Sequence, residues 1–328
     1  MSTTKVRLAV VGTGGIARHH MRNLVKIGES EIVGQCDVEH TRADAMAKEF
    51  GGRAYDRADA MLDREKPDAV LICTPPFARL DPIKAACDRK IPFFCEKPPA
   101  FSLEDAQKVN AVVSSAEIVH SIGFMYRHKE TTDRAKELLA GQTLVALRST
   151  FVCGAILSPE FPAWFKLQDK SGGPMLDQAI HAVDLIRYVI GDIESVYALG
   201  SNCVTKRGPE LTVNDTLNVA LNFASGLGGT HNHSWAVAES QIVIEVICRD
   251  ARVVIDLSDN SLTGSVKGMK FEFRPKDDCY ITEMKRFMQA VRSRNMAPIR
   301  STYADAVKTL AVCIAANKSA QTGVAEKV

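Results

Sequence analysis

A glycine-rich turn near the start of the chain joins an apolar strand pattern to a helix pattern. The strand covers Lys5–Val11, and the helix after the turn runs to about Ile27, where Gly28 ends it. A second strand, Glu31–Cys36, finishes at Asp37. This order, strand, G-x-G-x-x-A turn, helix and acid-terminated strand, is the fingerprint of a dinucleotide site. The turn residues are Gly12, Thr13, Gly14, Gly15, Ile16 and Ala17.

Each part of this turn has a physical role in the fingerprint. Gly12 permits the tight turn, Gly14 lets the backbone approach a pyrophosphate, and Ala17 allows the helix to pack closely on the strand. The phosphates would lie at the helix N-terminus, where unpaired backbone N–H groups favour anions. Asp37 would accept hydrogen bonds from the adenosine ribose hydroxyls.

Asp37 also bears on the choice of cofactor. A carboxylate at this position repels a 2′-phosphate, so NAD is the expected cofactor. His40 and Arg42 follow closely in the sequence and keep NADP open as the alternative.

Strands and helices continue to alternate up to residue 122. Four more strands are predicted, at Arg53–Tyr55, Ala69–Cys73, Ile91–Cys95 and Glu117–Ile122. Helices are predicted between them, at Thr41–Phe50, Arg57–Arg64, Leu80–Arg89 and 102–115. Six strands joined by helical crossovers predict a doubly wound parallel sheet, an α/β fold in which ligands bind beyond the carboxyl ends of the strands.

Two opposite charges stop the fifth strand abruptly. Glu96 and Lys97 follow it, and two prolines then forbid the strand from continuing. Taken alone, Lys97 could be a catalytic cation or a solvated turn residue. Gly12, Thr74-Pro75 and Lys97 all follow the carboxyl ends of strands, so they are predicted to share one rim of the sheet. That position favours the catalytic interpretation.

A different pattern begins at Gly123. Long alternating segments joined by short turns predict a largely antiparallel sheet, with strands at Leu144–Cys153, Ser195–Thr205, Thr216–Phe223, Gly228–Trp235, Ile242–Cys248 and Arg252–Leu257. Helices are expected at Lys129–Leu139, Leu176–Ile190, Ile281–Arg294 and Tyr303–Ser319. The sequence therefore predicts two domains, residues 1–122 with the parallel sheet and residues 123–328 as an α+β domain with a large open sheet.

The predicted helix Leu176–Ile190 carries a polar group of side chains beside its apolar stripe. Asp177, His181 and Asp184 are spaced by four and three residues, so they share one face. An Asp and a His four residues apart can act as an orienting carboxylate and a proton acceptor. A merely solvated helix face is the alternative.

Two other features have structural interpretations that we prefer. His231 and His233 lie on one face of a strand and could suggest a metal, but no third ligand has a suitable spacing, so a packing or interface role is favoured. Cys95 has no evident His partner and is expected to be a buried structural thiol.

Composition narrows the class of protein. The formal net charge is +2, without a Lys/Arg block, so nucleic acid is not expected as a partner. No apolar run approaches the roughly 20 residues that span a bilayer, and residues 1–5 lack a signal-peptide core. Nine cysteines without a CxxC pair fit reduced thiols in the cytoplasm.

These motifs together resemble those of the Gfo/Idh/MocA oxidoreductases, the family named for glucose-fructose oxidoreductase and inositol dehydrogenase. The resemblance runs nearly end to end. Besides the glycine turn and Asp37, it is carried by Thr74-Pro75, Cys95-Glu96-Lys97-Pro98, Gly123-Phe124-x-Tyr126-Arg127 and the run from Gly172-Gly173-Pro174 through Asp177-x-x-x-His181 to Asp184-Leu185.

The resemblance implies a Rossmann domain followed by a mixed domain whose sheet commonly forms an oligomer interface, here of a homodimer or homotetramer. It implies hydride transfer to or from a sugar, cyclitol or related polyol, with catalytic roles for Lys97, Asp177 and His181. The cofactor-binding residues would be Gly12, Thr13, Gly14, Gly15, Ile16, Ala17, Asp37, Thr74, Pro75, Glu96 and Lys97. The substrate-binding residues would be Tyr126, Arg127, Trp164, Asp177 and His181.

The sequence departs from the family pattern at two places. The family often has His where Arg79 stands, and Asn where Met125 precedes Tyr126. Substrate identity therefore stays open. The rival functions are an NADPH-dependent carbonyl reductase, which runs the same chemistry in reverse, and a non-catalytic nucleotide-binding regulator. The complete set of Lys97, Asp177 and His181 argues against the regulator.

Overall fold

The computed structural model describes residues 5–328 and divides the chain into two compact units. The first unit comprises residues 5–128 and Asp278–Val307, and the second comprises Lys129–Asp277 and Lys308–Val328. The chain thus returns to the first unit after building most of the second. The segment 123–328, predicted as one continuous domain, contributes residues to both units.

A six-stranded parallel sheet forms the centre of the first unit, as predicted. Its strands are β1 (Val6–Val11), β2 (Ser30–Cys36), β3 (Arg53–Tyr55), β4 (Ala69–Ile72), β5 (Phe93–Glu96) and β6 (His120–Gly123). Their order is β3-β2-β1-β4-β5-β6. The direction of winding reverses at β1, so the carboxyl ends of β1 and β4 lie side by side at the switch point where doubly wound sheets bind ligands.

Helices alternate with these strands along the chain. They are α1 (Gly15–Ile27), α2 (His40–Phe50), α3 (Ala58–Glu65), α4 (Leu80–Asp88) and α5 (Leu103–Ala116). Gly28 ends α1 in the left-handed conformation, with φ of 72°. Ser102 caps α5 by accepting a hydrogen bond from the backbone N–H of Asp105 at 3.1 Å.

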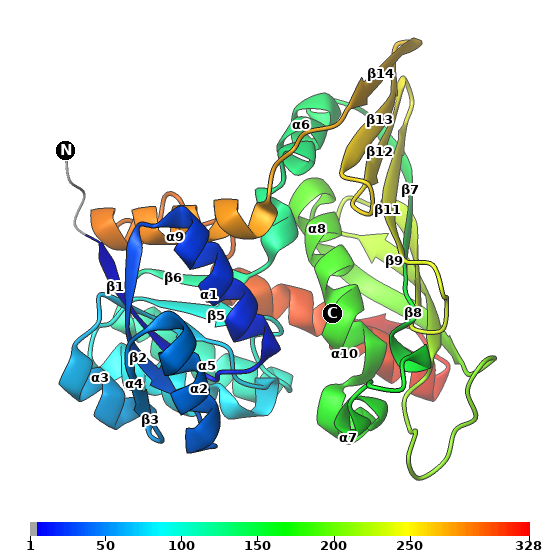
Figure 1. Cartoon of the computed structure of the whole chain (residues 1–328). Helices are drawn as coiled ribbons and strands as arrows, with labels where there is room; N and C mark the ends of the chain where they lie inside the picture. The colour runs from blue at the N-terminus through cyan, green and yellow to red at the C-terminus, as the bar shows by residue number, and fades with distance from the viewer. Residues whose placement is uncertain (1–4) are drawn as a thin grey trace. The chain divides into compact units, whose positions relative to one another are not determined.

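The first unit recruits one helix from late in the chain, α9 (Cys279–Ser293). Met284, Phe287 and Met288 of α9 join the apolar cluster that contains Leu8 of β1 and Met21 of α1. Figure 1 shows α9 beside α1. This packing explains why Asp278–Val307 belongs to the first unit, because the apolar face of α9 is buried there.

The second unit is built on a nine-stranded sheet. Its strands are β7 (Leu144–Val152), β8 (Ile193–Ser201), β9 (Thr216–Phe223), β10 (Gly228–Ser234), β11 (Gln241–Cys248), β12 (Ala251–Asp256), β13 (Ser261–Val266), β14 (Met269–Phe273) and β15 (Glu326–Lys327). The order is β14-β13-β12-β11-β7-β10-β9-β8-β15, and of these neighbours only β7 and β10 are parallel. The predicted large, mostly antiparallel sheet is confirmed.

One face of this sheet is buried and the other is exposed. Along β8, Val196 and Ala198 are buried, whereas Tyr197 and Leu199 between them are exposed. The helices of this unit include α6 (Glu130–Leu139), α7 (Gln168–Ser171) and α8 (Ile180–Ile190), and α10 (Tyr303–Thr322) contributes residues to both units. Figure 1 shows α8 running along the sheet, where it contacts β11.

Within residues 5–328, no helix is both long and apolar enough to cross a membrane. Residues 1–4, on which part of the signal-peptide expectation rests, lie outside the described residues.

Candidate active site

The glycine turn after β1 can take no other residue at its first position. Gly12 has φ of +86°, and a Cβ there would lie 2.8 Å from both the carbonyl carbon of Cys73 and the nitrogen of Thr74. This close approach places the turn directly against the loop that follows β4. A Cβ built on Gly14 or Gly15 would meet no atom within 4 Å, so the backbone at the start of α1 is open. An open helix N-terminus of this kind fits a pyrophosphate.

Asp37 is fixed beside this turn by hydrogen bonds to its carboxylate. The backbone N–H and the hydroxyl of Thr13 donate to Oδ2 at 2.8 and 2.9 Å, and the backbone N–H of Glu39 donates to Oδ1 at 3.0 Å. The nearby cation Arg42 pairs with Glu39 at 3.0 Å. The end of β2 therefore presents a carboxylate suited to ribose hydroxyls and unfavourable for a 2′-phosphate.

Lys97 follows β5 directly and is half-buried rather than freely solvated. Its backbone N–H donates to the Glu96 carboxylate at 3.1 Å, and its peptide bond to Pro98 is cis. The loops after β1, β4 and β5 all lie at the carboxyl edge of the parallel sheet. The first unit thus carries the glycine turn, Thr74 and Lys97 on one rim, where they were predicted to be.

Glu96 has a buried partner that the sequence did not reveal. His20 of α1 is fully buried, and its Nε2 lies 2.7 Å from Oε1 of Glu96. Burial alone would raise the pKa of Glu96, but the hydrogen bond and charge of His20, followed by Lys97 and Arg79, hold that pKa below its usual value. Glu96 therefore remains an anion beneath Lys97. In the sequence, the one indication that His20 faces inward is its position three residues after Ala17, which places both on the same face of the helix.

In the second unit, the predicted helix over Leu176–Ile190 is not a regular α-helix throughout. Met175–Ala179 forms a π-helix, and α8 begins only at Ile180. The oxygen Oε1 of Gln178 accepts hydrogen bonds from Trp235 Nε1 at 2.9 Å and from Cys153 Sγ at 2.8 Å, which ties this wide turn to the sheet. π turns are frequent at functional sites. The apolar residues of this segment have helical spacing, and that spacing does not distinguish a π-helix from an α-helix.

The polar side chains of this helix are not a solvated face. His181 is 8% exposed, Asp184 is 1% exposed and Asp177 is half-buried. Asp184 accepts a hydrogen bond from the Thr309 hydroxyl at 3.0 Å, and Arg187 donates to the same hydroxyl at 2.7 Å. Asp184 therefore belongs to a buried network that holds α8 to α10, whereas Asp177 and His181 remain the candidates for chemistry in this unit.

The three remaining predicted substrate residues have unlike environments. Tyr126 is half-buried, and burial raises the pKa of its phenol. The guanidinium of Arg127 is buried and forms an ion pair with Asp305 at 2.6 Å, which favours a structural role. Trp164 is 37% exposed and stacks on Phe165, with 3.8 Å between ring centroids. Of the three, Trp164 presents the most open surface.

The two strand histidines are buried in the second unit. Nδ1 of His231 lies 3.0 Å from the Ser149 hydroxyl, and burial lowers the pKa of His231 to about 4. Burial, followed by the charge of His231, also lowers the pKa of His233. Within residues 5–328, no three His, Cys, Asp or Glu side chains are grouped so that they could hold a metal ion. Two uncharged imidazoles in the core fit the packing role.

Two parts of the chain match models of one oxidoreductase family. Residues 6–124 match the family model described as "Oxidoreductase family, NAD-binding Rossmann fold", and residues 133–254 match the GFO/IDH/MocA C-terminal domain. The chain belongs to the GFO/IDH/MocA oxidoreductase family. Residues 6–124, which hold the open glycine turn and the fixed Asp37, are the part of the chain that matches the NAD-binding fold of the family.

Several members of this family are similar to the chain over most of its length. Myo-inositol 2-dehydrogenase of Thermotoga maritima is 27% identical, covering 88% of this chain and 89% of that protein. The NAD-dependent scyllo-inositol 2-dehydrogenase of Bacillus subtilis is 29% identical, covering 97% and 95%. A solved structure of levoglucosan dehydrogenase with NADH superposes with a TM-score of 0.89 at 19% identity, covering 99% of each chain, which establishes the shared fold.

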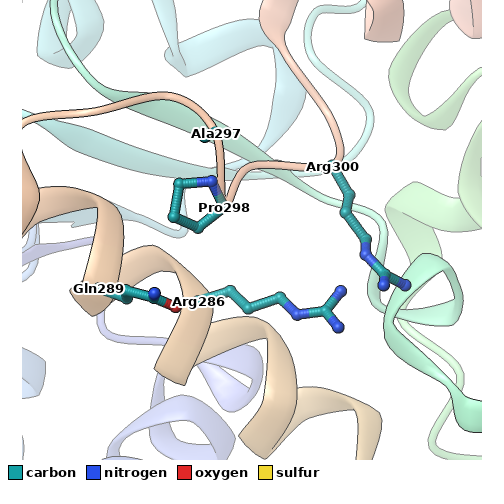
Figure 2. Close-up of a pocket in the computed structure, with 5 residues that line it drawn as sticks. All are labelled: Arg286, Gln289, Ala297, Pro298 and Arg300. Atoms are coloured by element: carbon teal, nitrogen blue, oxygen red, sulfur yellow. The ribbon is translucent and has the colours of Figure 1, made fainter.

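The first unit also contains a pocket that lies apart from the predicted cofactor site. Arg286 and Gln289 of α9 line it together with Ala297, Pro298 and Arg300, and its volume is about 360 Å³. Figure 2 shows the guanidinium groups of Arg286 and Arg300 extending into the same space. None of these residues belongs to the glycine turn or to the Lys97 segment.

The pKa of the buried His128 is lowered in part by the positive charge of nearby arginines. Burial, followed by the charges of Arg286, Arg300 and Arg127, lowers the pKa of His128 to about 3. The imidazole is therefore uncharged at neutral pH, and its contact with Glu283 at 3.8 Å is not an ion pair.

Proposed function

We propose that this oxidoreductase is an NAD-dependent dehydrogenase that acts on a CH–OH group of a sugar, a cyclitol or a related polyol. The observation that carries the proposal is the position of Lys97, half-buried on the same sheet rim as the glycine turn of an NAD-binding fold. Relatives named inositol, glucoside and xylose dehydrogenases support this substrate class.

Oxidation of the substrate carbinol requires that a hydride and a proton leave it. NAD, when bound, supplies the hydride acceptor. In our proposal the ammonium of Lys97 donates a hydrogen bond to the reacting oxygen and stabilises its developing negative charge. The imidazole of His181 accepts the hydroxyl proton, as histidine does in many enzymes near neutral pH. The carboxylate of Asp177 orients the imidazole or binds a neighbouring hydroxyl.

The remaining assignments follow from this proposal. The cofactor would bind to the glycine turn, Asp37, Thr74-Pro75 and the Glu96-Lys97 segment. Tyr126 and Trp164 would shape the substrate site, and Arg127, expected from the family resemblance to bind substrate, would support it structurally through its ion pair with Asp305. The second unit would bind substrate and form a homodimer or homotetramer through the exposed face of its sheet. Nine cysteines without a disulfide among the described residues support a location in the reducing cytoplasm.

A substrate panel tests the proposed function. The purified protein is mixed with NAD and, separately, with myo-inositol, scyllo-inositol, D-xylose, D-glucose, glucose 6-phosphate and levoglucosan, and the absorbance of NADH is followed. We expect NADH to form with at least one of these polyols. NADPH oxidation with aldehydes and ketones, in the absence of any NAD-dependent polyol oxidation, would instead support the carbonyl reductase alternative.

A further inference from the structure

The segment after Lys97 has an unusual shortage of backbone hydrogen-bond donors. Pro98 and Pro99 have no N–H group, so this stretch cannot be anchored through its amides. Donors from elsewhere must bind its carbonyl oxygens if the segment is to be held in one position. Two buried side chains supply such donors, Arg79 and Tyr303.

Arg79 bridges the loops after β4 and β5 with its guanidinium group. Its Nε and Nη2 donate to the carbonyl oxygen of Thr74 at 3.1 and 3.0 Å, and Nη2 also donates to the carbonyl oxygen of Lys97 at 3.0 Å. The residue is only 3% exposed. The hydroxyl of Tyr303 donates to the carbonyl oxygen of Pro99 at 3.0 Å, so the segment is held at a second point.

The opposite side of the Lys97 backbone is held by an anion. Glu96 accepts the N–H of Lys97 at 3.1 Å and is itself held by His20 at 2.7 Å. Lys97 thus lies between a buried carboxylate and a buried guanidinium, and hydrogen bonds that involve a charged partner are about twice as strong as neutral ones. The arrangement fixes the backbone of Lys97 from both sides.

We infer that Arg79 is a positioning residue for Lys97, because its guanidinium group fixes the Lys97 carbonyl relative to the cofactor loop at Thr74. The inference rests on the proposed catalytic role of Lys97. Arg79 is well suited to this task because a planar guanidinium binds two carbonyl oxygens in fixed directions, which the single ammonium of a lysine cannot reproduce. Displacement of a catalytic group by about 1 Å can cost about 100-fold in rate.

The test compares Arg79→Met, Arg79→Lys and Lys97→Ala with the wild type. The matched control is Arg89→Met, at the other end of α4, where the guanidinium donates to the Ala85 carbonyl at 3.0 Å and pairs with Asp63 at 2.7 Å. Turnover is measured with whichever panel compound the wild type oxidises fastest, and NADH affinity by fluorescence titration. A third readout, which needs no substrate, is the rate at which acetic anhydride labels Lys97 relative to exposed Lys108, followed by mass spectrometry.

For Arg79→Met we expect turnover to fall by about 10- to 100-fold. NADH affinity should fall by less than turnover, because Arg79 also holds the carbonyl oxygen of Thr74 in the cofactor loop. Arg79→Lys should recover part of that loss, and Arg89→Met should retain wild-type turnover. The relative labelling rate of Lys97 should change by about threefold or more in Arg79→Met and stay constant in Arg89→Met. If Arg79→Met does not fold, Arg79→Lys, which keeps the buried charge, carries the same comparisons.

Two different failures can be told apart. Wild-type turnover and an unchanged Lys97 labelling rate in the Arg79 variants, together with inactive Lys97→Ala, would overturn the positioning role and leave the proposed function intact. Wild-type turnover in Lys97→Ala would overturn the catalytic role of Lys97 itself. A loss of turnover in Arg79→Met that is matched by Arg89→Met would show general destabilisation and would also overturn the inference.

Discussion

Gly123, at the end of β6, leaves room for the buried carboxylate beneath Lys97. A Cβ at this position would lie 2.9 Å from Cζ of Phe94 and 3.2 Å from Oε1 of Glu96. Neither neighbour can withdraw easily, because Phe94 is fully buried and Glu96 is bonded to His20. The absence of a side chain at Gly123 is therefore part of what allows Glu96 to reach both His20 and Lys97.

We predict that Gly123→Ala lowers the free energy of unfolding by about 1–3 kcal/mol, because the added methyl group overpacks the site. Urea unfolding followed by circular dichroism measures the change. Gly228→Ala is the matched control in a strand, since a Cβ there meets no atom within 4 Å. Equal stability of Gly123→Ala and the wild type would show that Phe94 and Glu96 can move apart without cost.

Asp37 is the residue that should set the cofactor preference. Loss of its hydrogen bonds to the ribose in Asp37→Ala should weaken NADH binding by about 10-fold or more, since hydrogen bonds to charged groups contribute about 1.5–3 kcal/mol. NADPH binding should weaken less or improve, because the repulsion of a 2′-phosphate is removed. Fluorescence titration with both cofactors measures the ratio, and Asp44→Ala, an exposed acid on α2, is the control. An equal loss for both cofactors would contradict this role.

At the scale of elements, β10 carries a pH-dependent contribution to stability. In the unfolded chain His231 regains an ordinary pKa of 6.5, whereas in the folded protein burial lowers it to about 4. Between these values the unfolded state binds more protons, so stability falls as the pH decreases from 6.5 towards 4. A difference of 2.5 pH units corresponds to roughly 3 kcal/mol at most.

We therefore expect His231→Asn to reduce the fall in stability over this acidic range, because the amide does not titrate. His233 and His128, whose pKa values burial also lowers, should keep part of the slope. The free energy of unfolding in urea at pH 7, 6 and 5 gives the slope for each variant. His40→Asn, at a histidine whose side chain is 56% exposed, is the control. A wild-type slope in His231→Asn would mean that His231 is not the titrating group.

Some of the secondary-structure elements could be predicted from the sequence and others could not. The parallel sheet was predictable because each strand and turn has a local signature, as in the run from β1 to Asp37. β13 and β14 were missed because Gly264, Gly268 and several polar residues break the alternating pattern. Position 264 requires glycine, because a Cβ there would lie 1.9 Å from the carbonyl oxygen of Arg252 on the neighbouring strand.

The candidate site was predictable in the same uneven way. The positions of Lys97, Asp37 and the glycine turn at the ends of their strands could be predicted because local motifs carry them. The contacts of His20 with Glu96 and of Arg79 with Lys97 join residues 76 and 18 positions apart, and no local pattern encodes such pairs. The return of α9 to the first unit was missed for the same reason, because an amphipathic helix does not specify which sheet it covers.

At the scale of the whole molecule, the exposed face of the nine-stranded sheet is where we expect subunits to meet. Leu199 is 57% exposed on β8 and should be buried in the oligomer. Leu199→Glu would bury an unpaired charge there, so the variant should dissociate into smaller species than the wild type. Light scattering coupled to gel filtration measures the mass, and Val25→Glu on α1, where the side chain is 66% exposed, is the control. A monomeric wild type would contradict the proposed interface.

The decisive measurement for the proposed role of Lys97 is the turnover of Lys97→Ala, determined together with its NADH affinity. If Lys97 stabilises the reacting oxygen, turnover of the substrate identified in the panel should fall by about 100- to 1,000-fold. NADH affinity should fall far less than turnover, because the glycine turn and Asp37, which carry most of the proposed cofactor contacts, are untouched. Wild-type turnover in Lys97→Ala would contradict the account.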